Sequence, residues 1–201
     1  MPGGIAPSPE ENVETTVPRS PLLPAAFAYA GAAALALLVL PHLETPLVRY
    51  GHSAYGALVL GRDPVSGLLW GLGVGALLTA VGQVLTRRTA WGRRLEALLA
   101  RLVRGLHPVD ALLLAALSAL AEELVFRAIL LPYAGLWGSS ALFGLAHWVP
   151  REGLWPWGVW AFVAGLALGG TALTTGGILA PTTAHFVVNA VGLIVLSRGR
   201  R

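Results

Sequence analysis

Long apolar runs separated by short polar stretches dominate this sequence of 201 residues. Most of the runs are long enough to cross the hydrocarbon core of a bilayer as an α-helix. The pattern predicts six such segments, at residues 22–40, 64–86, 109–131, 133–149, 154–174 and 177–196. The predicted fold class is therefore all-α: a polytopic membrane helical bundle of about six transmembrane helices.

A different periodicity fills the stretch between the second and third runs. Leucines recur at helical spacing and arginines face away from them in residues 91–106. The pattern predicts an amphipathic basic helix on the inner membrane surface, near anionic lipids; the alternative is a helix packed on loops of its own protein. Residues 1–21 are rich in Pro, Ser and Glu and predict a disordered tail. Residues 22–201 then form a single membrane domain.

Composition supports the membrane interpretation and excludes most soluble classes. Hydrophobic residues make up 55% of the chain and charged residues 12%, the latter about half the share in soluble domains. A net charge of +4 would suggest nucleic acid in a soluble protein, but here the arginines gather in loops, so no nucleic-acid partner is expected. The positive-inside rule places those loops and both termini in the cytoplasm. We predict an integral protein of a bacterial or archaeal plasma membrane, with the lipid bilayer as a partner.

Two further patterns predict packing and membrane position. Small residues repeat every fourth position at Gly67, Gly71 and Gly75, and again at Gly165 and Gly169, which lets helices approach closely. Tryptophans cluster between the fourth and fifth runs and are typical of an aromatic belt at the membrane interface, with a substrate-binding surface as the alternative. They are Trp148, Trp155, Trp157 and Trp160.

The third apolar run carries the charges that lie clear of helix ends: Glu122, Glu123 and Arg127. Each charge at mid-membrane costs about 2.5–3.5 kcal/mol on insertion scales, so the group requires a functional or structural reason. Glu123 and Arg127 are four residues apart, which predicts an ion pair on one helix face. Glu122 lies about 100° around the helix from Glu123 and is expected to point elsewhere.

Other polar side chains lie in the fourth and sixth runs. His147 is in the fourth, and His185 shares a helix face with Asn189 in the sixth. Glu122 is roughly 15 Å along a helix from Pro132, so it can meet His185 near the midplane. His147 is only three residues before Pro150 and looks too shallow, unless the fourth segment is deep, tilted or broken near Gly135 and Gly138.

One unpaired acid, two imidazoles and an amide from three helices suit hydrolysis of an acyl bond by water. A carboxylate shielded from water is a stronger base and can take a proton from water. An imidazole beside it can share that proton. Peptide hydrolysis also needs donors aimed at the developing oxyanion, a role that His185 and Asn189 suit.

Together these residues form a known pattern. Residues 122–127 match EExxxR, residues 143–147 match FxxxH and residues 185–189 match HxxxN. The sequence resembles the CPBP (Abi) family of intramembrane proteases, which includes the type II CAAX prenyl endopeptidases. The resemblance covers about residues 108–197 and implies that Glu122 activates water, with help from His147. It also implies that His185 and Asn189 form the oxyanion hole, while Glu123 and Arg127 organise the site.

The predicted function is hydrolysis of a peptide bond in a membrane-associated or lipidated peptide, without a cofactor. A zinc-dependent version of the same protease is the first alternative, with Glu122, His147 and His185 as ligands; the chain has no H-E-x-x-H sequence. The second is a non-catalytic membrane scaffold or regulator, in which the polar cluster only joins helices. The sequence does not name the substrate.

Overall fold

The computed structural model describes residues 22–43 and 60–198. Throughout these residues the regular elements are helices, which confirms the all-helical prediction. They are α1 (Leu22–Val39), the 3-10 helix η1 (Leu40–His42), α4 (Pro64–Arg88), α5 (Ala90–Val103), α6 (Pro108–Glu123), the π-helix η2 (Leu124–Leu130), α7 (Leu131–Ala146), α8 (Trp155–Thr175) and α9 (Leu179–Arg198). The tail predicted at residues 1–21 lies outside the described residues.

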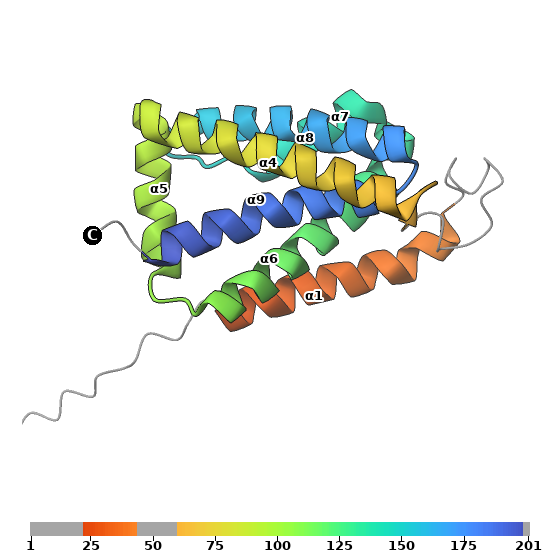
Figure 1. Ribbon diagram of the computed structural model, residues 1–201, viewed down its shortest axis with the longest axis horizontal. Coiled ribbons are helices and arrows are strands. Elements are labelled where there is room, and N and C mark those ends of the chain that lie inside the picture. Colours follow the sequence, from red (N-terminus) through yellow and green to blue (C-terminus); the bar gives the residue numbers. More distant parts are fainter. Residues whose placement is uncertain (1–21, 44–59, 199–201) are drawn as a thin grey trace, which may run out of the picture.

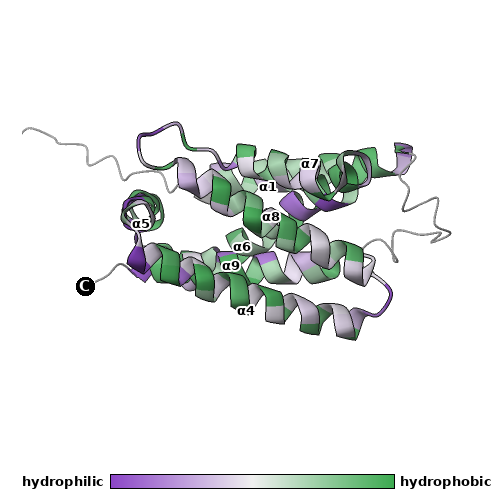
Figure 2. Cartoon of the chain, turned by 90° about the horizontal axis from the view of Figure 1, so that it is seen from above, coloured by the Kyte–Doolittle hydropathy of each residue, from purple (hydrophilic) through white to green (hydrophobic). Residues whose placement is uncertain are grey.

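In the described part of the chain, four helical segments are long and apolar enough to cross a membrane: Leu23–His42, Pro64–Arg88, Trp155–Thr175 and Leu179–Arg198. They coincide with the first, second, fifth and sixth predicted spans. Large apolar side chains cover their outer faces, such as Phe27, which is 74% exposed. Hydrophilic residues gather instead near α5 and in the loops (Figure 2). The protein is therefore an integral membrane protein.

The third and fourth predicted spans fold differently from simple crossing helices. Regular α-helical structure ends at Glu123, and the π-helix η2 continues the chain to Leu130. Within α7 the backbone breaks at Gly135, where φ is 68° and ψ is 177°. Beyond that point the chain returns along η2, and the Ser139 hydroxyl donates to the Phe126 carbonyl over 2.6 Å. The expected break is confirmed at Gly135, whereas Gly138 has helical backbone; a total of six spans stays a prediction.

The predicted amphipathic helix is α5, which crosses the end of the bundle nearly at right angles (Figure 1). In Figure 2 it is seen end on. Thr89 forms the corner: its hydroxyl donates to the Leu85 carbonyl over 2.7 Å and accepts from the Gly92 N–H over 3.0 Å. On α5 the side chain of Leu95 is buried while Arg93 is exposed. The helix therefore packs on the bundle through its apolar face, and its contact with lipid stays a prediction.

The α9 helix, which carries His185 and Asn189, lies between α4 and α6. The predicted glycine row on α4 makes the close approach possible. A Cβ atom at Gly71 would lie 2.6 Å from both the Ala180 carbonyl oxygen and the Thr183 Cβ. At Gly75 it would lie 2.8 Å from the Ala184 carbonyl oxygen. The row fixes the position of α9 and, with it, the position of the polar residues on that helix.

Candidate active site

The side chains of Glu123 and Arg127 form the buried ion pair that their spacing predicts. Arg127 Nε lies 3.1 Å from Glu123 Oε2, and both side chains are almost completely buried. Arg127 Nη2 also donates to the Gly165 carbonyl oxygen of α8 over 3.2 Å. The remaining Glu123 oxygen, Oε1, lies 2.8 Å from His185 Nδ1 on α9. This chain of contacts joins α6, η2, α8 and α9 at one point.

Glu122 points away from that ion pair and toward both histidines. Its Oε2 atom lies 3.7 Å from His147 Nε2 and 3.8 Å from His185 Nε2. This oxygen is buried and has no hydrogen-bond partner in the described part of the protein. Burying an ionised oxygen without a partner costs free energy, and such a group in a membrane helix indicates a functional role. The structure thus brings together the acid and both imidazoles that the sequence singled out.

His147 reaches this depth because α7 is short. The helix ends at Ala146, and residues 148–154 continue without helical structure. That segment runs toward the α5 end of the bundle, where α8 begins (Figure 1). The expectation that His147 is too shallow to meet Glu122 is wrong, because His147 Nε2 lies 3.7 Å from Glu122 Oε2.

The tautomers of the two histidines follow from their partners. His147 Nδ1 lies 2.8 Å from the Phe143 carbonyl oxygen, which can only accept, so Nδ1 carries a proton. In His185 the same atom donates to the Glu123 carboxylate. In the neutral form of each ring, Nε2 is then an acceptor facing Glu122. His185 becomes a donor through Nε2 only as an imidazolium.

Asn189 lies one helical turn beyond His185 and makes a different contact. Its Nδ2 atom donates to the Ser118 hydroxyl over 3.0 Å, and that hydroxyl donates to the Ala115 carbonyl oxygen over 3.2 Å. An amide nitrogen carries two hydrogens, so one of them is left to point elsewhere. Ser118 lies four residues before Glu122 on α6, and it orients the Asn189 amide.

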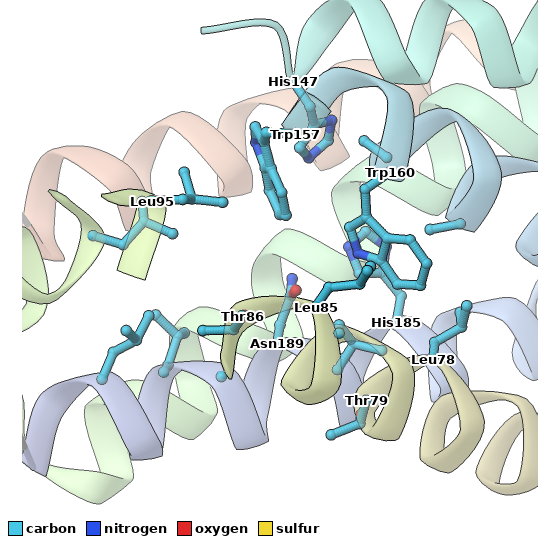
Figure 3. A pocket seen from close by; sticks show the side chains of 18 of the residues that line it. Leu78, Thr79, Leu85, Thr86, Leu95, His147, Trp157, Trp160, His185 and Asn189 are labelled. Atoms are coloured by element: carbon cyan, nitrogen blue, oxygen red, sulfur yellow. The ribbon is translucent and has the colours of Figure 1, made fainter. Parts of the chain in front are cut away.

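These side chains border a cavity of about 450 Å³. Glu122, His147 and His185 lie on its wall, and the cavity continues to Leu95 and Leu99 of α5. Figure 3 shows the ring of Trp157 beside His147, and Trp160 lines the same cavity. The four tryptophans of the predicted aromatic belt therefore lie in two different environments. Trp148 and Trp155 are exposed, while Trp157 and Trp160 line the cavity. A largely apolar space thus adjoins the polar cluster.

Sequence reasoning did not select two residues that the structure places at the site. Ser118 contacts Asn189, and Tyr29 of α1 lies close to Glu122 on the wall of the same cavity. The spacing of Ser118 and Glu122 places them on one helix face, which could have drawn attention to Ser118. No signal in the sequence distinguishes Tyr29 from a tyrosine at a membrane interface, because its proximity to Glu122 depends on how α1 packs.

Glu122, His147 and His185, the ligands of the zinc alternative, approach one another through Glu122 Oε2 and the two imidazole Nε2 atoms. In residues 22–43 and 60–198, no group of three or more His, Cys, Asp or Glu side chains is placed to hold a metal ion. The Nδ1 atoms of His147 and His185 each contact a protein oxygen that accepts a hydrogen bond. Their Nε2 atoms lie near Glu122 Oε2, and these three atoms form the polar cluster. Imidazole and carboxylate are donors that zinc accepts, so zinc dependence stays a prediction that chelation can test.

Comparison with known proteins separates two parts of the chain. Residues 104–191 match the family model described as Type II CAAX prenyl endopeptidase Rce1-like. This Rce1-like segment contains all three motifs, and the match agrees with the family that they resemble. Tyr29, α4 and α5 lie outside the Rce1-like segment.

The chain also has a relative among curated proteins. "Uncharacterized protein YpbD" of Bacillus subtilis (strain 168) is 36% identical over 77 residues, or 37% of this chain. The match spans 39% of the length of that relative. No solved structure matches the chain. The relationship therefore extends to a protease family, while substrate and mechanism have to be argued from the geometry.

Proposed function

We propose that this protein is an intramembrane endopeptidase that cleaves a membrane-associated or lipidated peptide with water activated by Glu122. The observation that carries the proposal is the Glu122 Oε2 atom, which is buried, has no hydrogen-bond partner among residues 22–43 and 60–198, and lies close to both imidazole Nε2 atoms. The match of residues 104–191 to a protease family supports the same conclusion. The adjoining cavity gives a peptide access to these atoms.

In the proposed reaction, a water molecule between Glu122 and His147 attacks the carbonyl carbon of the scissile peptide bond. Glu122 Oε2 takes one proton from the water as the new carbon–oxygen bond forms. The carbonyl π electrons move to oxygen and produce a tetrahedral oxyanion. His147 Nε2 accepts a hydrogen bond from the same water and holds it in line for attack.

The oxyanion requires donors positioned before the reaction begins. The free hydrogen of Asn189 Nδ2 supplies one, because Ser118 engages only the other. The imidazolium of His185 supplies a second through Nε2, and Glu123 stabilises its positive charge through Nδ1. Collapse of the intermediate breaks the carbon–nitrogen bond, and the proton held by Glu122 passes to the leaving nitrogen. The products are a carboxylic acid and an amine.

The test is Glu122→Gln in the full-length protein reconstituted in liposomes, assayed with peptides carrying an alkyl or isoprenoid anchor. Loss of a positioned general base lowers a rate by about 100- to 10,000-fold, and we expect a fall of that size in kcat. Glu152→Gln is the matched control, because Glu152 is exposed in the loop before α8. Full activity of Glu122→Gln would overturn the assignment.

The scaffold alternative makes the opposite prediction. A regulator that uses the polar cluster only to join helices would cleave no peptide in the panel. It would also retain a bound partner when Glu122 is replaced. Measuring cleavage and partner retention on the same variants separates the two functions.

A further inference from the structure

Tyr29 joins α1 to the candidate active site. Its side chain lies close to the Glu122 carboxylate, and both residues border the same cavity. The tyrosine lies on α1, well before the Rce1-like segment begins at residue 104. The contact therefore connects a proposed catalytic group with a part of the chain that the family match does not include.

The position of Tyr29 is set by the packing of α1 against α6 and η2. Its ring packs on a buried cluster that includes Ala33 and Ala36 from α1 and Ala121 and Leu124 from the opposite side. Tyr29 and Ala33 are four residues apart and share a helix face. The small alanine side chains let the helices approach closely. The opposite face of α1 is exposed, so the contact with Glu122 is made by the packed face.

A phenol hydroxyl is well suited to this place. Glu122 has two oxygens, and Oε2 has no hydrogen-bond partner among the described residues. A hydroxyl donating to the other oxygen would give that oxygen a hydrogen-bond partner where water is scarce. It would also fix the rotation of the carboxylate so that Oε2 faces His147 and His185. Tyr29 would thus direct the reactive oxygen without contacting the substrate.

We propose that Tyr29 is a positioning residue for Glu122 and that α1 is needed to complete the active site. The inference rests on the proposed role of Glu122 as the general base. It follows that residues 104–191, although they contain all three motifs, do not make a fully active site.

The experiment is Tyr29→Phe in the full-length reconstituted protein, which keeps the ring and removes only the hydroxyl. We expect kcat to fall by about 10- to 100-fold, the range for a hydrogen bond to a charged group, with KM and the thermal unfolding midpoint unchanged. Phe27→Leu is the matched control, since Phe27 is on the same helix and 74% exposed; it should behave as wild type.

A purely structural role for Tyr29 predicts a different result. If ring packing alone mattered, Tyr29→Phe would be normal and only Tyr29→Leu would be impaired, with a lower unfolding midpoint. Wild-type kcat in Tyr29→Phe overturns the inference. If Glu122→Gln is inactive at the same time, the proposed function survives; if Glu122→Gln is fully active, the proposed function fails as well.

Discussion

His185 Nδ1 donates a hydrogen bond to Glu123 Oε1 over 2.8 Å, although the two residues are 62 positions apart in the chain. Glu123 thereby has two partners, because its other oxygen contacts Arg127 Nε at 3.1 Å. Glu123, which follows the proposed general base Glu122 in the chain, thus holds His185, the histidine that faces Glu122. Glu122, Glu123 and Arg127, the charged residues of the third apolar run, accordingly have separate structural roles.

Glu123→Gln should damage both stability and activity. The substitution leaves the buried Arg127 guanidinium without its counter-charge, and breaking a buried pair in this way costs about 3–5 kcal/mol. We expect a lower unfolding midpoint by circular dichroism in detergent, together with slower cleavage. Glu122→Gln serves for comparison, because Glu122 is not the ion-pair partner of Arg127; it should lose activity while keeping its unfolding midpoint. Equal midpoints for the two variants would contradict this division of roles.

Ser118→Ala should weaken the proposed oxyanion hole without unfolding the protein. The hydroxyl holds the Asn189 amide over 3.0 Å, and a neutral hydrogen bond contributes about 0.5–1.5 kcal/mol net. We expect kcat to fall by roughly 3- to 10-fold, in line with that energy. Adding Ser118→Ala to Asn189→Ala should cause little further loss, because both changes remove the same donor. Independent, multiplicative effects would show that Ser118 does not act through Asn189.

Gly71→Ala should destabilise the protein, whereas Gly73→Ala should not. A Cβ at Gly71 would meet the α9 backbone at 2.6 Å, and one at Gly73 would meet nothing within 4 Å. Overpacking of this kind costs about 1–3 kcal/mol, while alanine is favoured over glycine within an exposed helix by about 1 kcal/mol. Thermal unfolding of the two variants measures the contrast. Activity of Gly71→Ala should also fall, since α9 carries His185 and Asn189.

Removal of metal ions distinguishes the glutamate mechanism from its zinc-dependent alternative. Proton transfer by Glu122 predicts unchanged cleavage after prolonged treatment with a chelator and transfer into metal-free buffer. A zinc enzyme would lose activity under the same treatment and regain it when zinc is added back. Metal content of the purified protein, measured by mass spectrometry, provides a readout independent of activity.

Much of this protein follows from hydrophobic pattern and short-range spacing. The apolar runs predicted the positions of α1, α4, α8 and α9, because a bilayer requires long apolar helices whatever their neighbours are. The four-residue spacing predicted the Glu123–Arg127 pair, since a helix places such residues on one face. The repeated glycines predicted close packing, and the pattern of leucines and arginines predicted the amphipathic α5.

Tertiary structure alone decided the contacts between distant segments. The break at Gly135 and the early end of α7 placed His147 beside Glu122. Simple helical geometry had predicted that His147 is too shallow to reach Glu122. The packing of α1 brought Tyr29 to the same carboxylate, and the approach of α9 to α6 joined Asn189 to Ser118. Periodicity reports the face of a helix on which a residue lies. Which other helix meets that face depends on side-chain packing across the whole bundle, and local sequence does not encode it.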